Sequence, residues 1–112
     1  MVTMIMKQTE EMFERFIAGK APLKRKWQMH LIEMDKQTSE GEESKFSAIV
    51  FKHYQHTIAI YNLDEKQFVW RWYEKKADQR GYFSIVDWMS ISENLERLFK
   101  ETDRRIANGY KK

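Results

Sequence analysis

The chain has 112 residues, of which 42% are hydrophobic and 33% are charged, so it fits one globular domain spanning residues 1–112 and is not an intrinsically disordered chain. Its net charge of +3 permits a nucleic-acid partner without requiring one. The lack of cysteine excludes disulfides, thiol nucleophiles and cysteine-type zinc sites, and neither a membrane-spanning apolar stretch nor a signal peptide is recognisable, which together indicate a cytoplasmic protein.

The first predicted element is an amphipathic helix over residues 4–18, where apolar side chains recur at helical spacing. Gly19 suits the C-cap of this helix, and Pro22 prevents its continuation. Residues 23–35 then alternate between apolar and polar side chains, which predicts a half-buried β-strand.

Three more strands are predicted at residues 45–54, 56–63 and 67–74, because these stretches are rich in β-branched and aromatic residues. The short connections between them favour an antiparallel meander over parallel crossovers. The charged segment 76–81 is interpreted as a turn, and residues 82–86 as a possible short fifth strand.

A second amphipathic helix follows and ends at Asn108 and Gly109. Ser90 is interpreted as its N-cap, with Glu93 as the capping-box partner. The predicted fold class is therefore α+β, with a helix at each end of a four- or five-stranded antiparallel meander sheet. Because both helices are amphipathic, we expect them to cover one face of that sheet.

The large apolar residues of the strands are assigned to the helix-covered face. This set consists of Trp27, Met29, Leu31, Ile58, Ile60, Phe68, Trp70 and Trp72. Strand alternation then places a mixture of cations and aromatic rings on the free face. The residues predicted there to bind nucleic acid are Lys24, Lys26, His30, Tyr61, Arg71, Tyr73 and Lys75. Cations neutralise phosphates and exposed rings stack on unpaired bases, although the same alternation is typical of any strand with one solvated face.

No set of residues indicates catalysis. His53 and His56 are three residues apart, with His30 elsewhere, and a strand followed by a tight turn aims these side chains in directions poorly matched for a metal ion. The four glycines are isolated, so the sequence contains no phosphate-binding loop. Ser90 is better explained as a helix cap than as a nucleophile. We therefore expect a non-enzymatic protein without a metal or cofactor.

Residues 68–74 form an aromatic and basic strand, residues 80–83 carry a short Arg-Gly-aromatic motif, and residues 90–93 start an amphipathic helix. Together, residues 23–108 resemble the unit shared by the positive-cofactor-four coactivators, the Whirly proteins and the Pur repeats. The resemblance implies binding of single-stranded DNA or RNA on a curved sheet and oligomerisation partly through helices. It implies the following binding residues: Lys24, Lys26, Arg71, Tyr73 and Lys75.

Two features depart from that family pattern. The N-terminal helix is additional, and residues 87–89 (Asp-Trp-Met) stand where the coactivators have a Gly/Lys-rich element. These departures affect the oligomer geometry and the path of the nucleic acid that the resemblance implies.

Two functional hypotheses follow. The first is a protein that binds single-stranded nucleic acid, with DNA favoured over RNA. It would act as a homodimer or larger homo-oligomer and would make no membrane contact. The second is a small protein-interaction module, such as an accessory or inhibitor protein of a phage or mobile element, without affinity for nucleic acid. In that case Tyr82 and Trp88 are candidate hot spots for a protein partner.

Overall fold

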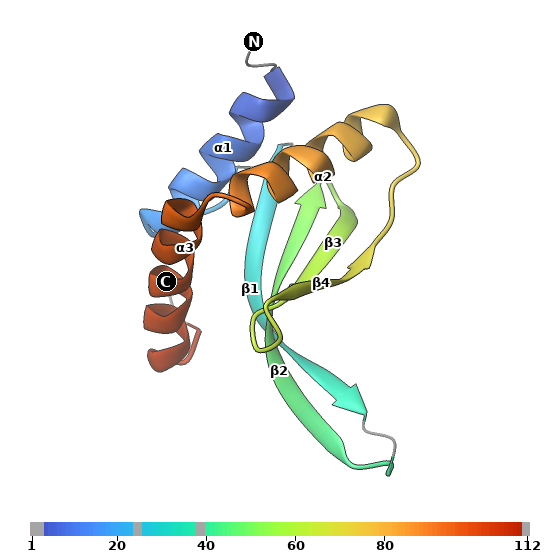
Figure 1. The fold of residues 1–112 in the computed structure, drawn as a ribbon, viewed down its shortest axis with the longest axis vertical. Helices are drawn as coiled ribbons and strands as arrows, with labels where there is room; N and C mark the ends of the chain where they lie inside the picture. The colour runs from blue at the N-terminus through green and yellow to red at the C-terminus, as the bar shows by residue number, and fades with distance from the viewer. Residues whose placement is uncertain (1–3, 24–25, 38–39, 111–112) are drawn as a thin grey trace.

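The computed structural model, which describes residues 4–23, 26–37 and 40–110, places three helices against one four-stranded antiparallel sheet (Figure 1). The strands pair in sequence order as a meander, and they are β1 (Trp27–Gln37), β2 (Glu43–His53), β3 (His56–Asn62) and β4 (Gln67–Arg71). The helices are α1 (Met4–Ile17), α2 (Lys76–Met89) and α3 (Ser92–Ala107). The predicted α+β fold with a meander sheet is therefore confirmed.

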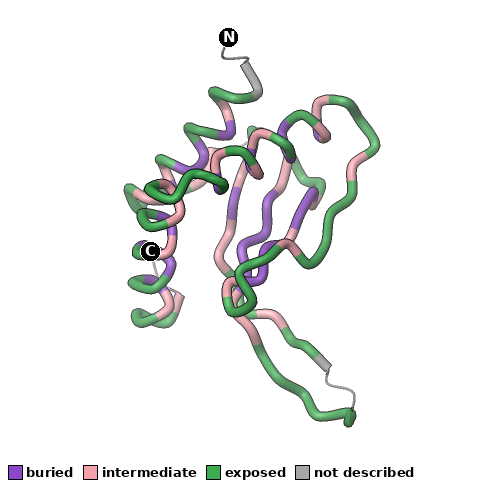
Figure 2. Tube along the Cα trace, viewed as in Figure 1, coloured by how far each residue is buried: buried purple, intermediate pink, exposed green. Residues whose placement is uncertain are grey.

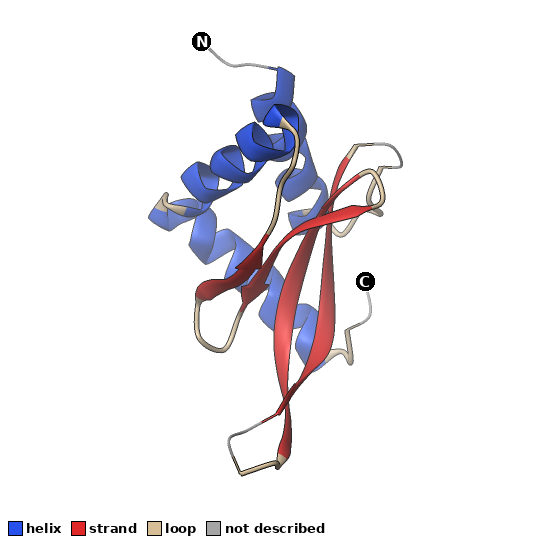
Figure 3. Cartoon of the chain, turned by 90° about the vertical axis from the view of Figure 1, so that its right-hand side faces the viewer, coloured by secondary structure: helices blue, strands red, loops and turns tan. Residues whose placement is uncertain are grey.

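The core lies between the sheet and the helices, which occupy the same side of it (Figure 3). Each layer contributes side chains that are fully buried, among them Phe13 from α1, Phe51 from β2, Ile85 from α2 and Leu98 from α3. Burial of this apolar surface is the main favourable contribution to folding. Among the described residues, no helix combines the length and the apolar character that crossing a bilayer would require.

The segment after β4 is helical, so the predicted turn at 76–81 and the predicted strand at 82–86 are wrong. Tyr82, Ile85 and Met89 recur at helical spacing, and all three are buried in the core. Their β-forming neighbours suggest a strand in isolation, but packing of this stripe against the sheet decides the conformation.

The predicted capping box at Ser90 is also wrong, because Ser90 terminates α2. Its backbone N–H donates to the Val86 carbonyl at 2.9 Å, and its hydroxyl donates to the Asp87 carbonyl at 2.6 Å. Ile91 consequently takes the N-cap position of α3, where no side chain caps the helix.

The β1–β2 hairpin extends well beyond the other two strands (Figure 1). The pairing of β1 with β2 runs from Trp27 and His53 to Gln37 and Glu43, whereas the pairing of β2 with β3 stops at Ala48. The far part of the hairpin is thus a two-stranded ribbon, and Figure 2 shows it largely exposed.

Candidate nucleic-acid interface

A β-bulge in β4 decides which of its side chains face the helices. Phe68 pairs with Tyr61 and Trp70 pairs with Ile60, so Val69 has no partner in the ladder. One inserted residue moves every following side chain to the opposite face of the sheet. Within β4, the face assignments made from sequence are therefore correct before Val69 and inverted after it.

Beyond the bulge, Arg71 and Tyr73 lie on the helix side. The guanidinium carbon of Arg71 is 5.6 Å from the centroid of the Tyr82 ring in α2, and the Tyr73 and Tyr82 ring centroids are 6.0 Å apart. Trp70 and Trp72 alternate to the opposite side, with 43% and 49% of their surface exposed. The prediction that both tryptophans belong to the core is thus wrong.

A second bulge, at Ile58, has the same effect on β3. Phe51 pairs with Ala59 and Lys52 pairs with Thr57, so Ile58 is the extra residue. Ala59 and Tyr61 consequently face the helices, and both are buried. Tyr61 was expected on the free face, but it is buried on the helix side, and this burial raises the pKa of its hydroxyl.

Correspondingly, Ile60 lies on the free face, in a cross-strand row with His30, Val50 and Trp70. This row is apolar at its centre, and Val50 is only 7% exposed. His30 is held at its Nε2 by the Gln28 side-chain oxygen, 3.1 Å away. The middle of the free face is therefore not the basic and aromatic surface that the strand pattern predicts.

Exposed rings and cations instead gather along the edge strand β4, the connection after it and the first turns of α2. We call this set the β4 surface; it consists of Trp70, Arg71, Trp72, Lys75, Lys76, Arg80 and Phe83, all exposed. Within α2, Lys76, Arg80 and Phe83 recur at i, i+4 and i+7, so they share one stripe of the helix. The ring centroid of Tyr73 is 6.4 Å from that of Phe83, which joins the stripe to the strand.

The cations of the β4 surface form no ion pair with the described part of the chain. Within the described part of the chain, no carboxylate forms an ion pair with Arg71, Lys75, Lys76 or Arg80. The acid nearest to them in α2 is Asp78, which is buried and bonded at Oδ1 to His53 Nδ1, 2.6 Å away. A local excess of positive charge beside exposed rings suits a polyanion that carries unpaired bases.

The structure therefore brings together three of the seven residues predicted to bind nucleic acid: Arg71, Tyr73 and Lys75. Lys26 immediately precedes β1, and His30 lies on β1, at the other edge of the sheet. Strands β2 and β3 separate these two residues from β4. Tyr61 is buried, and Lys24 lies outside the described residues.

Sequence reasoning missed several members of the β4 surface. The tryptophans were missed because neither bulge carries a glycine or another sequence signal. The i, i+4, i+7 spacing of Lys76, Arg80 and Phe83 was present in the sequence and becomes informative once residues 76–89 are recognised as helical.

No arrangement for metal binding is found among the residues that the structure describes. His53 is hydrogen-bonded to Asp78 and stacks on Trp27, with ring centroids 4.6 Å apart, so it links β2 to α2 and β1.

Comparisons of the chain with protein-family models, with curated proteins and with solved structures returned no match.

Proposed function

We propose that this protein binds single-stranded nucleic acid, with DNA favoured over RNA, through the β4 surface and without catalysing a reaction. One observation carries the proposal: three exposed aromatic rings and four cations without a carboxylate partner among the described residues lie along the β4 edge of the sheet. Trp70 and Trp72 are on one side of this edge, and Arg71 is on the helix side. The cations would contact phosphates and release their counterions, and the rings would stack on bases. Assembly into a homodimer or larger oligomer stays a prediction.

Stacking gives the first test. Replacing Trp70 or Trp72 by alanine is expected to weaken binding of a labelled single-stranded oligonucleotide by about 5- to 160-fold, since one base–ring stack is worth about 1–3 kcal/mol. Fluorescence anisotropy at low salt measures this loss. Tyr54→Ala is the matched control, because Tyr54 is also an exposed ring (52%) but lies at the β2–β3 turn. Equal affinity of all three variants and the unaltered protein would contradict the assignment.

Charge gives the second test. The double variant Lys76→Ala/Arg80→Ala is expected to reduce the slope of log affinity against log salt by about 0.7 for each phosphate that the protein no longer neutralises. Lys7→Ala/Lys100→Ala removes the same charge from exposed positions on α1 and α3 and is expected to leave the slope unchanged. The proposal fails if both double variants change the slope equally, because general electrostatic attraction would then explain the binding.

The second hypothesis, a protein-interaction module, is favoured by a different feature, the apolar side chains on the free sheet face, where Ile60 is half-buried and Ile32 is 37% exposed. Phosphates gain nothing from an uncharged apolar row, whereas a protein partner does. Absence of single-strand binding at low salt would exclude the β4 surface as a nucleic-acid site and would leave the protein-interaction module as the function to test.

A further inference from the structure

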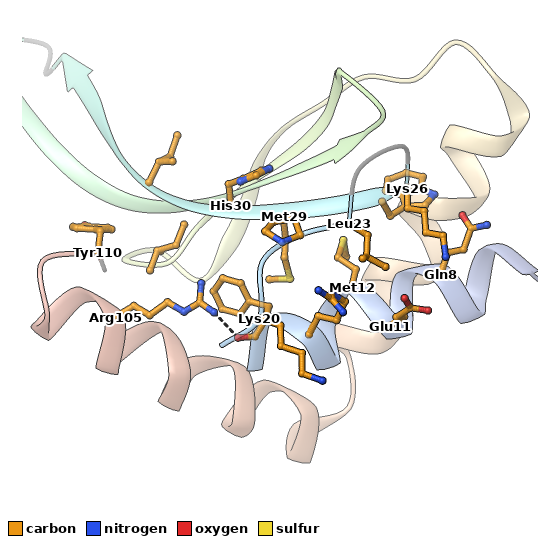
Figure 4. A pocket seen from close by; sticks show the side chains of 16 residues that line it. Gln8, Glu11, Met12, Lys20, Leu23, Lys26, Met29, His30, Arg105 and Tyr110 are labelled. Atoms are coloured by element: carbon orange, nitrogen blue, oxygen red, sulfur yellow. Dashed lines mark hydrogen bonds between the residues drawn. The ribbon is translucent and has the colours of Figure 1, made fainter. Parts of the chain in front are cut away.

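A pocket of about 170 Å³ lies between β1, α1 and α3, at the β1 edge of the sheet (Figure 4). Two strands separate it from the β4 surface, so it is independent of the proposed nucleic-acid binding. Figure 4 shows Gln8, Glu11 and Lys26 toward one end of the pocket and Arg105 and Tyr110 toward the other.

The inner wall of the pocket is apolar. Its side chains are Met12, Phe16, Leu23, Trp27, Met29 and Leu31. Four of them are at most 5% exposed, so the wall is part of the packed core and does not depend on a ligand for its shape. Such a wall favours the apolar portion of a ligand, at roughly fourfold in affinity for each buried methylene.

The rim of the pocket is predominantly basic. Among the described residues that line it, the cations Arg15, Lys20, Lys26 and Arg105 face the single acid Glu11. Arg105 is already occupied, because Glu101 and the Phe16 carbonyl accept hydrogen bonds from it.

Arg15 is held in place but retains donors. Its Nε and Nη2 both donate to the Ala21 carbonyl, at 3.1 and 2.8 Å, which leaves Nη1 available. Lys20 follows one residue after the turn at Gly19, is exposed and has no side-chain partner among the described residues. These two groups form a partly preorganised site for an anion at the mouth of an apolar pocket.

We propose that this pocket binds a small amphipathic carboxylate, in which a short alkyl chain or a single ring enters the apolar part and the carboxylate pairs with Lys20 and Arg15. The size sets the class of ligand, since an engineered cavity of roughly 150 Å³ accommodates one benzene molecule. The basic rim selects the anionic head group over a neutral one.

The test uses octanoate and octan-1-ol, which share a chain length and differ in charge. Calorimetric titration of the intact protein is expected to give an octanoate dissociation constant on the order of 0.1–1 mM, as suits a ligand with about ten non-hydrogen atoms. Octan-1-ol should bind about tenfold more weakly, because it lacks the charge-assisted hydrogen bonds. No detectable octanoate binding at low salt would overturn the proposal.

Variants locate the site. Lys20→Glu is expected to weaken octanoate binding about tenfold and to leave octan-1-ol binding unchanged. Lys100→Glu makes the same charge change on an exposed part of α3 outside the pocket and should change neither affinity. Leu23 is half-buried in the pocket wall, so Leu23→Trp should fill the pocket and weaken the binding of both ligands. Circular dichroism confirms folding of each variant, and equal losses in Lys20→Glu and Lys100→Glu would refute this location.

Discussion

Gly81→Ala is expected to lower the free energy of unfolding by about 2–3 kcal/mol, although alanine is the better helix former by about 1 kcal/mol. Gly81 lies within α2 where the helix crosses Trp27, and a Cβ atom there would be 1.9 Å from Trp27 Cζ2. The indole ring cannot retreat, because it is 2% exposed and stacks on His53, which Asp78 holds. Overpacking therefore outweighs helix propensity at this position.

Urea denaturation followed by circular dichroism measures the effect. Gly19→Ala is the matched control, because Gly19 has a positive φ of 76° but nothing within 4 Å of an added Cβ, so this change carries backbone strain alone, about 1 kcal/mol. Trp27→Phe should partly rescue Gly81→Ala, since phenylalanine is smaller and lacks the indole N–H, which has no hydrogen-bond partner among the described residues. If Gly81→Ala costs no more than Gly19→Ala, the close approach of α2 to Trp27 is not as described.

Glu101→Gln is expected to cost about 3 kcal/mol, because it leaves the buried Arg105 without its counter-charge. Glu101 accepts a hydrogen bond from Arg105 Nε at 2.8 Å and two from Arg104, at 2.9 and 2.7 Å. Arg105 is 5% exposed, and its guanidinium carbon lies 3.7 Å from the centroid of the Phe16 ring. The pair thereby joins α3 to the end of α1.

The same urea experiment on Glu65→Gln serves as the control. Glu65 pairs with Lys36 at 2.9 Å, but both side chains are more than one-third exposed, so losing this solvent-screened pair should destabilise the protein far less than losing the buried pair. A similar loss of stability in the two variants would show that burial of the Arg105 pair has no special importance.

The Glu101 pair also predicts how stability responds to acid. The two hydrogen bonds from Arg104, followed by the one from Arg105, lower the pKa of Glu101 from 4.5 to about 2. A depressed pKa in the folded state stabilises the protein above pH 4.5, and that contribution, on the order of 3 kcal/mol, is lost as the pH falls from 4.5 toward 2. Because Glu101→Gln lacks this carboxylate, the difference in unfolding free energy between it and the unaltered protein should shrink from pH 6 to pH 3. A constant difference would contradict the assigned pKa.

The elements predicted correctly are those whose conformation follows from the apolar periodicity within their own segment of the sequence. The helix over residues 4–18, the strand pattern from Trp27 to Leu31 and the helix that contains Leu98 each follow one periodicity, and each lies close to its predicted position. The prediction of a turn and a strand within residues 76–89 failed because Tyr82 and the β-branched residues that follow it have strand propensity. The core against which this segment packs is formed by residues far away in sequence.

The candidate site was harder to predict than the fold. Its residues depend on two bulges, at Ile58 and Val69, each of which inverts the alternation beyond it. A bulge forms where cross-strand packing favours it, and strand periodicity read from a single sequence assumes that there is none. The sequence therefore named Arg71 and Lys75 as binding residues, but Arg71, like Trp70 and Trp72, was assigned to the wrong face.

The two-stranded ribbon at the far end of β1 and β2 differs from the rest of the sheet in how strongly its unfolding is coupled to unfolding of the domain. Amide groups from Glu33 to Gln37 and from Glu43 to Phe46 share hydrogen bonds with one neighbouring strand and cover no part of the apolar core. We expect their exchange with solvent hydrogen to require separation of this ribbon alone, and we expect the amides of the fully buried Ile49 and Phe51 to exchange when the whole domain unfolds. We therefore expect the outer part of the hairpin to open at a lower free-energy cost than the central strands, on which the helices pack.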